Sequence, residues 1–170
     1  TYNSSASLIT QMDSLSLVVQ HDFATDRLRI YPVSPPNSFG NPQKSLQLLI
    51  NHISELPERF NQIVIDSITP LMTNASPVSK IDFFQACKEL CAKNRSIILV
   101  VDTHALEKSM LSRAYLISDY YLTLRSENMI LESGQVDDRV IKVLGVLKLR
   151  GAECQAMEGI KFEIKPKVAI

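Results

Sequence analysis

The stretch Ile63-Val64-Ile65-Asp66 is a short apolar run, rich in β-branched residues, that ends in a carboxylate. Such a run is too short for a buried helix and is typical of a strand that is covered on both faces of a parallel sheet. Residues 97–101 (Ile-Ile-Leu-Val-Val) have the same character and are followed by Asp102. The sequence therefore predicts two buried parallel strands, the first of them in a central position.

Amphipathic helices are predicted around these strands. Asn41 and Pro42 are typical of an N-cap and a first-turn proline, and they begin a helix that ends near Pro57. Ser79 and Asp82 resemble a capping box at the start of the helix between the strands. The apolar stripe of the first of these helices is formed by Leu46, Leu49, Ile50 and Ile53.

The two ends of the chain differ in character. Residues 8–15 have helical spacing, residues 27–33 alternate like a strand, and a short helix is predicted over residues 107–117. From Asp119 onward, strand-like pieces joined by turns predict an antiparallel extension. These pieces cover residues 121–124, 129–132, 140–148 and 160–164. The predicted fold class is therefore α/β, with a mostly parallel sheet flanked by helices and an antiparallel C-terminal extension.

Length and composition predict one domain, covering residues 1–170. The sequence is 45% hydrophobic, and its 18 basic residues balance 18 acidic ones. This balance argues against the strong positive field of a nucleic-acid-binding protein, so a nucleic-acid partner is not expected. No apolar run approaches the length of a membrane span, and we expect a cytoplasmic protein.

The three cysteines, Cys87, Cys91 and Cys154, form no Cys-x-x-Cys pair. An odd number without this spacing argues against a disulfide framework or a zinc site. We expect Cys87 and Cys91, which lie four residues apart on a predicted helix, to be small core residues.

Polar residues directly follow both predicted buried strands. Ligands of open parallel sheets bind beyond the carboxyl ends of the strands, so these residues are candidates for a site. Asp66, with Ser67 beside it, can hold Mg²⁺ next to a bound triphosphate, directly or through water; the alternative is a turn-forming aspartate. His104, in the group Asp102-Thr103-His104, can sense a γ-phosphate or orient water, and the alternative is a hydrogen-bonded loop.

Lys148 and Arg150 alternate at the end of a predicted strand, so they are expected to project from the same face. Two cations suit a phosphate, because arginine pairs bidentately with phosphate oxygens; ordinary surface charge is the alternative. No G-x-x-x-x-G-K-[ST] loop occurs in the sequence, and the glycines at 40, 134, 145, 151 and 159 never cluster. Without such a loop the chain is not expected to bind a triphosphate in the usual P-loop way.

The order of these features resembles the KaiC/RadA branch of the RecA superfamily of P-loop ATPases over nearly the whole chain. The matching features include the strand that ends in Asp66, the Thr-His pair at 103–104, Lys-x-Arg-Gly at 148–151 and Gly-Ile-x-Phe-Glu-Ile at 159–164. Within this branch, residues 9–17 (ITQMDSLSL) and 27–33 (RLRIYPV) are most similar to the FlaH family of accessory ATPases of the archaellum, the archaeal flagellum. The resemblance implies a RecA-like core that binds ATP and Mg²⁺, with Asp66 as the Walker B aspartate. It also implies that the family's first strand and phosphate loop lie upstream of Thr1, so the chain is expected to begin inside its domain. Such a chain should leave an apolar gap in the sheet and bind ATP poorly by itself.

The resemblance also implies a homo-oligomeric ring, a hexamer, in which Lys148 and Arg150 reach the nucleotide of a neighbouring subunit. The candidate ATP-binding residues are thus Asp66, Ser67, His104, Lys148 and Arg150. FlaH proteins accompany the motor ATPase FlaI beneath the membrane protein FlaJ, so a cytoplasmic subunit peripheral to the motor is implied, acting in motility by nucleotide-dependent binding. The catalytic glutamate of the family has no counterpart in Asn3-Ser4-Ser5-Ala6. Weak or no hydrolysis is therefore implied, and no catalytic residue is assigned.

Two other functions are compatible with this fold class. A RadA-like recombination ATPase would bind DNA through flexible loops, whereas residues 104–115 are predicted to form a compact approach to a helix. A KaiC-like signalling ATPase would show real turnover and self-phosphorylation.

Overall fold

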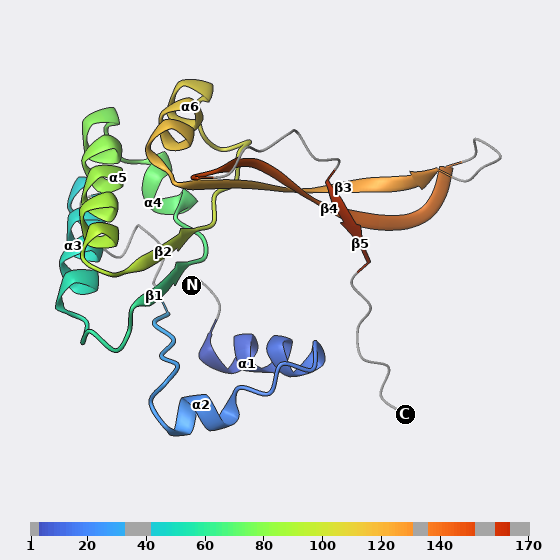
Figure 1. The fold of residues 1–170 in the computed structure, drawn as a ribbon, viewed down its shortest axis with the longest axis horizontal. Coiled ribbons are helices and arrows are strands. Elements are labelled where there is room, and N and C mark those ends of the chain that lie inside the picture. Colours follow the sequence, from blue (N-terminus) through green and yellow to red (C-terminus); the bar gives the residue numbers. More distant parts are fainter. Residues whose placement is uncertain (1–3, 33–41, 131–135, 152–158, 164–170) are drawn as a thin grey trace. The chain divides into compact units, whose positions relative to one another are not determined.

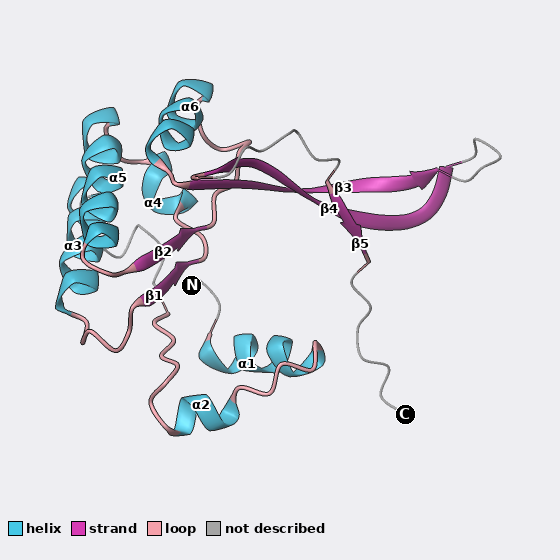
Figure 2. Ribbon diagram, in the orientation of Figure 1, coloured by secondary structure: helices cyan, strands magenta, loops and turns pink. Residues whose placement is uncertain are grey.

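A computed structural model of the chain describes residues 4–32, 42–130, 136–151 and 159–163. The chain divides into two compact units, Thr1–Ile117 and Ser118–Ile170. Helices alternate with parallel strands in the first unit, and the second is an antiparallel sheet (Figure 1, Figure 2). The predicted α/β class is confirmed, whereas the assignment of residues 1–170 to a single domain stays a prediction.

The first unit contains a parallel pair of strands, β1 (Gln62–Ile65) and β2 (Ser96–Leu99), with Ile63 opposite Ile97. Successive side chains of a strand face opposite sides of the sheet. Ile63 and Ile97 accordingly pack against the hydrophobic core, while Val64 and Ile98 are each 60% exposed. The predicted parallel pairing is confirmed, but the prediction that both faces are covered is wrong, because the buried core packs against one face. In the described part of the chain β1 has β2 as its one strand neighbour, so its predicted central position is not observed.

Four helices build the core of the first unit: α3 (Pro42–Glu55), α4 (Thr69–Thr73), α5 (Pro77–Ala92) and α6 (Lys108–Ile117). The predicted stripe of α3 is confirmed, since Leu46, Ile50 and Ile53 are buried and Leu49 packs against them. The predicted helix over residues 107–117 corresponds to α6, and the Asn41 cap lies outside the described residues. No helix in the described ranges is long and apolar enough to cross a membrane.

The start of α5 differs from the prediction. Ser76 is the N-cap, and its hydroxyl accepts a hydrogen bond from the Ser79 backbone N–H at 3.2 Å. Pro77 occupies the first helical position, where its fixed φ is favourable and its missing N–H costs nothing. The prediction that Ser79 and Asp82 form the capping box is therefore wrong. The helix begins about one turn earlier, and Ser79 is already its third residue.

The N-terminal segment contains two helices, α1 (Ser5–Ser14) and α2 (Gln20–Ala24). The first confirms the predicted helical spacing. The prediction of a strand over residues 27–33 is wrong for residues 27–32, which have no regular secondary structure. Val33 lies outside the described residues.

Side chains, not backbone pairing, hold this segment to the loop after α3. Arg29 Nε lies 2.5 Å from Asp26 Oδ1, and Arg59 also pairs with Asp26. The guanidinium groups of Arg29 and Arg59 lie 4.7 and 5.0 Å from the centre of the Phe60 ring, within cation–π range. Arg29 therefore attaches residues 27–32 to Asp26 and Phe60 through side-chain contacts, and these residues pair with no strand in the described part of the chain.

The second unit is an antiparallel sheet in the order β3 (Tyr120–Ile130), β4 (Val136–Leu149) and β5 (Ile160–Phe162). The predicted antiparallel extension is confirmed. The two pieces predicted at 121–124 and 129–132 are one strand, because residues 125–128 continue the ladder opposite β4; residues 131–132 lie outside the described part.

The two faces of this sheet differ in polarity. Val143 is fully buried and lies in register between Arg125 and Lys161, on the face that also carries Glu127. Glu127 pairs with both cations, at 2.6 Å from Arg125 and 4.0 Å from Lys161. The other face exposes large apolar side chains, including Leu122, Leu124 and Ile160.

Candidate functional site

Asp66 and Ser67 directly follow β1, as predicted. Backbone hydrogen bonds fix this turn beside the end of β2: Val100 N–H donates to Ile65 O at 3.0 Å, and Ile68 N–H donates to Val100 O at 3.1 Å. The peptide bond between Asp66 and Ser67 is cis. Asp66 is exposed and Ser67 is half-buried, so the carboxylate is open to a ligand while the backbone on either side is held.

The loop after β2 is tied to the same edge of the sheet. Asp102 N–H donates to the hydroxyl of Thr69 at 2.8 Å, and His104 N–H donates to Asp102 Oδ1 at 2.9 Å. Thr69 is buried, so its hydroxyl holds the loop against the core of the first unit. The Asp102 carboxylate accepts the second bond and thereby forms an Asx-type turn. The backbone N–H of His104 takes part in this turn, and His104 is exposed to solvent. The position of Asp102 was predicted from the sequence, whereas the hydrogen bond from its N–H to the Thr69 hydroxyl was not.

These bonds bring the turn of Asp66 and Ser67 and the loop of His104 together at the carboxyl ends of two parallel strands. That is the edge where open α/β sheets bind ligands. The Asp102 turn matches the hydrogen-bonded loop considered as an alternative for this group. A phosphate-sensing role for the exposed His104 side chain stays a prediction.

Lys148 and Arg150 belong to the second unit. Lys148 lies on β4 opposite Tyr121, and Arg150 lies just past the end of that strand. The Arg150 backbone N–H donates to Asp119 O at 2.9 Å, and its Nη1 donates to Asp119 Oδ1 at 2.7 Å. The Arg150 side chain is nevertheless 70% exposed, so it keeps donors that can reach an anion. The pairing of Arg150 with Asp119 was not predicted from the sequence.

The residues after β1 fit a magnesium ion that keeps most of its water. Mg²⁺ is commonly held by one or two carboxylates, water and the phosphates of a nucleotide, and not by a cage of protein ligands. Asp66 supplies one exposed carboxylate, and the described residues contain no cluster of three or more potential metal-binding side chains. Asp66 and Ser67 would hold such an ion only together with a bound phosphate group.

The cysteines take no part in this edge of the sheet. Cys87 is buried in the core, as predicted, and Cys91 is half-buried on the same helix; Cys154 lies outside the described residues. Burial, with a smaller effect of the neighbouring Cys91, raises the pKa of the Cys87 thiol to about 12. A thiol with such a pKa stays protonated and is a poor nucleophile or metal ligand near neutral pH.

The chain is an α/β protein with a parallel pair of strands, two loops at the carboxyl ends of those strands, and a separate antiparallel sheet. Among solved structures, the chain is similar to the flagellar accessory protein FlaH from Methanocaldococcus jannaschii. The TM-score is 0.77, the sequence identity is 21%, and the match covers 97% of this chain and 70% of that chain. The sequence matches no protein-family model and no curated protein. The similarity establishes a FlaH-like fold.

Proposed function

We propose that the intact protein binds ATP with Mg²⁺ and acts as a regulatory or assembly subunit of an archaellum motor. The observation that carries this proposal is the exposed Asp66 carboxylate at the carboxyl end of a parallel strand in a FlaH-like fold. Its partners would be a FlaI-type motor ATPase and a FlaJ-type membrane protein. Binding to these partners would place the protein at the cytoplasmic side of the motor.

In this proposal Asp66 holds Mg²⁺ directly or through water, with the Ser67 hydroxyl beside it. His104 lies on the neighbouring loop and would respond to the γ-phosphate. The firmly bonded Asp102 turn supports the proposal, because it gives His104 a fixed backbone position next to the first loop. The ion would supply positive charge that neutralises the phosphate oxygens of the bound nucleotide.

Lys148 and Arg150 would contact the nucleotide of a neighbouring subunit in a homo-oligomeric ring. The Asp119 carboxylate holds Arg150 by one guanidinium nitrogen and leaves its other donors for a phosphate. No residue in this chain is assigned as a catalytic base. The proposed output is therefore a change in partner binding and not rapid hydrolysis.

The test uses the intact protein and two matched variants, Asp66→Asn and Asp13→Asn. Asp13 is an exposed carboxylate on α1, not at a strand end, and controls for the loss of charge. Calorimetry should show Mg-ATP binding to the parent protein and to Asp13→Asn. Binding to Asp66→Asn should be weaker by about tenfold or more, the range seen when a carboxylate that supports a metal is changed.

Binding of a FlaI-type ATPase is then measured with and without ATP. The parent protein and Asp13→Asn should bind it differently in the two conditions, and Asp66→Asn should lose the difference. Equal binding in all conditions, with unchanged ATP affinity in Asp66→Asn, would refute the proposal.

A further inference from the structure

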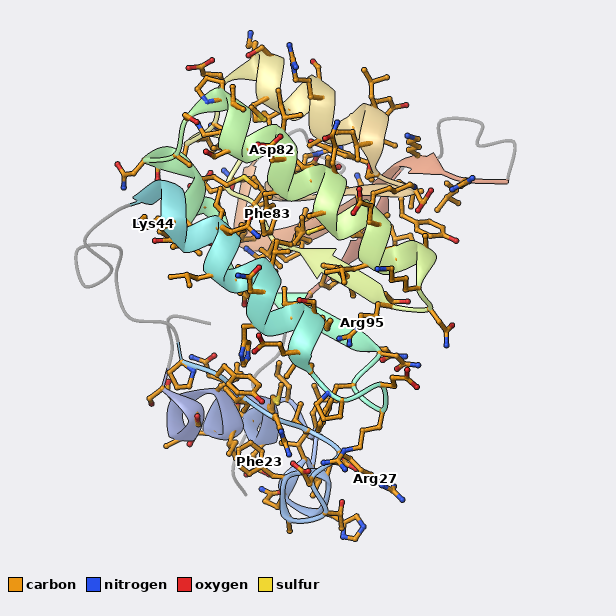
Figure 3. The ribbon with its side chains drawn as sticks, turned by 90° about the vertical axis from the view of Figure 1, so that its left-hand side faces the viewer. Phe23, Arg27, Lys44, Asp82, Phe83 and Arg95 are labelled. Atoms are coloured by element: carbon orange, nitrogen blue, oxygen red, sulfur yellow. The ribbon has the colours of Figure 1, made fainter. Side chains whose placement is uncertain are left out.

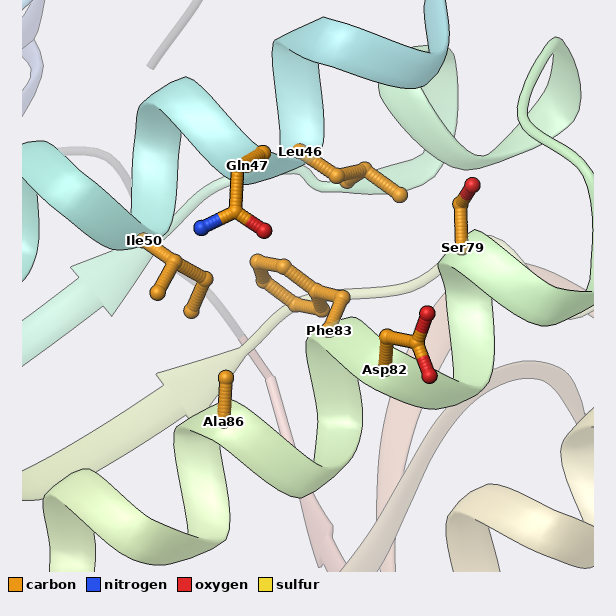
Figure 4. A pocket seen from close by; sticks show the side chains of 7 residues that line it. All are labelled: Leu46, Gln47, Ile50, Ser79, Asp82, Phe83 and Ala86. Atoms are coloured by element: carbon orange, nitrogen blue, oxygen red, sulfur yellow. The ribbon is translucent and has the colours of Figure 1, made fainter.

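The pocket between α3 and α5 is too small for a ligand of nucleotide size. Figure 4 shows it between facing side chains of the two helices, and Leu46, Ile50 and Phe83 in its lining are exposed by 2%, 9% and 2%. Its volume of about 60 Å³ is far below the roughly 300 Å³ at which typical ligand pockets begin. The two loops at the carboxyl ends of β1 and β2 are better placed to receive a nucleotide, and the contact between them bears on how they do so.

A side chain continues the contact between β1 and β2 beyond the last backbone bonds. Val100 N–H donates to Ile65 O at 3.0 Å, and Ile68 N–H donates to Val100 O at 3.1 Å. Two residues after Val100, the N–H of Asp102 donates to the hydroxyl of Thr69 at 2.8 Å and not to a backbone carbonyl. Beyond the sheet, the Thr69 hydroxyl therefore takes the place of the next strand partner.

Thr69 is a fixed point, whereas the loop that it holds is exposed. Thr69 is 7% exposed, and its neighbours Ile68 and Met72 are fully buried in the core of the first unit. Asp102 and His104 are exposed, and the Asp102 carboxylate accepts the His104 N–H at 2.9 Å. A relay of two hydrogen bonds thus runs from the buried Thr69 hydroxyl, through Asp102, to the backbone of His104.

We propose that Thr69 is a positioning residue that makes the site prefer ATP to ADP. The inference rests on the proposed function, in which Asp66 holds Mg²⁺ and His104 responds to the γ-phosphate. ATP and ADP differ by that phosphate, so a loop held in place for it favours ATP alone. The turn of Asp66 is fixed by backbone bonds that do not involve the Thr69 hydroxyl. Mg²⁺ and the phosphates common to both nucleotides are therefore bound without it.

The size of the preference follows from the population of the ordered loop. Without the Thr69 hydroxyl, the Asp102 N–H bonds to water and residues 102–104 adopt arrangements in which His104 is displaced. The affinity for ATP falls by the fraction of molecules that keep the competent arrangement. Loss of one neutral hydrogen bond lowers this fraction by up to about fivefold. ADP has no γ-phosphate, so its affinity does not depend on this fraction.

The test compares the intact protein with Thr69→Val, Thr69→Ser and Thr73→Val. Thr69→Val removes the hydroxyl and keeps the branched shape, whereas Thr69→Ser keeps the hydroxyl. Thr73→Val is the matched control, because its hydroxyl bonds to the carbonyls of Thr69 and Pro70 within α4 and not to the loop of Asp102. Without nucleotide, hydrogen exchange of the Asp102 amide, followed by NMR, should be faster in Thr69→Val than in the other three proteins.

Calorimetry then measures the affinities for Mg-ATP and Mg-ADP. The ratio of the ATP affinity to the ADP affinity should fall by up to about fivefold in Thr69→Val, with the ADP affinity unchanged. Thr69→Ser and Thr73→Val should keep the ratio of the parent protein. A purely structural role of Thr69 would weaken the binding of both nucleotides together and leave the ratio as it was.

Asp102→Ala tests the other bond of the relay at an exposed position, where the substitution does not disturb the core. It removes the acceptor of the His104 N–H, so it should lower the ratio as Thr69→Val does. The double variant should lose no more than either single variant, because both changes break the same relay. If Thr69→Val does not fold, Asp102→Ala decides the proposal.

An unchanged ratio, or equal weakening of ATP and ADP, would overturn the inference while the parent protein still binds ATP. Unchanged exchange of the Asp102 amide in Thr69→Val would also overturn it, as would an equal loss of preference in Thr69→Ser or Thr73→Val. A parent protein that binds ATP and ADP equally tightly has no preference to explain and refutes this inference alone. A parent protein that binds neither nucleotide would instead refute the proposed function, and the preference with it.

Discussion

Burial raises the pKa of the Cys87 thiol from 9.0 to about 12, with a smaller contribution from Cys91, and this shift links stability to pH. Between these values the unfolded chain loses the thiol proton while the folded chain keeps it. The contribution of the protonated Cys87 thiol to folding stability is therefore complete below pH 9.0 and is lost as the pH rises toward 12. The free energy of unfolding should fall by up to about 1.4 kcal/mol per pH unit from this group.

Denaturant unfolding of the parent protein and Cys87→Ala, below and above pH 9.0, measures this contribution. Cys87→Ala also leaves a small cavity, but that cost is the same at every pH, so the difference in slope isolates the thiol. Cys91→Ala is the control and should keep most of the slope, because burial of Cys87 is the larger cause. Parallel slopes in the parent protein and Cys87→Ala would contradict the burial-driven shift.

Partnerships between distant side chains could not be predicted from the sequence. Asp66 and Asp102 each follow a predicted parallel strand in the sequence. This order was sufficient to predict that both residues lie at the same edge of the sheet, because the carboxyl ends of parallel strands meet there. The bond from Asp102 to Thr69 joins residues that are 33 positions apart, and the bond from Arg150 to Asp119 joins residues that are 31 apart. Local periodicity carries no information on such pairs, so the sequence located candidate residues but not their partners.

Elements with strong periodicity were predictable, and those fixed by side-chain contacts were not. The stripe of α3 and the apolar runs of β1 and β2 follow directly from core burial. The segment of residues 27–32 alternates like a strand, but Asp26, Arg29 and Phe60 hold it without backbone pairing. The start of α5 was misplaced because Ser76 and Ser79 are both good caps, and Pro77 decides between them.

Arg95 stabilises the C-terminal end of α3, where backbone carbonyls have no partner within the helix. Its Nη1 donates to Ile53 O and its Nη2 to Leu56 O, each at 2.7 Å, and Figure 3 shows it beside that end of the helix. Arg95→Met should lower the free energy of unfolding by about 2 kcal/mol, because two charge-assisted bonds are lost. Arg95→Lys should lose less, since one ammonium replaces the fork of donors.

Urea unfolding at neutral pH measures these losses. Arg113→Met removes an exposed arginine of α6 that makes no hydrogen bond or ion pair with the described residues, and it should change stability by under about 0.5 kcal/mol. Similar losses in Arg95→Met and Arg113→Met would mean that net charge, and not the end of α3, explains the effect.

The two units differ in how much apolar surface they bury. The core cluster, from Leu46 to Met110, belongs wholly to the first unit. In the described part of the second unit, Val143 is the one buried hydrophobic side chain, while Leu122, Leu124 and Ile160 are more than half exposed. A short antiparallel sheet needs a buried apolar face or a covering helix to be stable alone. The described part of the second unit therefore lacks the buried apolar core that independent folding requires.

Residues 118–170 expressed alone are accordingly expected to show no cooperative thermal transition, whereas residues 1–170 should unfold in a single transition. Circular dichroism of the two chains, together with residues 1–117, makes the comparison. The single transition follows if the sheet gains stability from the rest of the chain, as the prediction of one domain over residues 1–170 requires. A cooperative transition of residues 118–170 at the same temperature as in the whole chain would show two independent domains. It would also mean that the polar face around Val143 stabilises the sheet more than its buried area indicates.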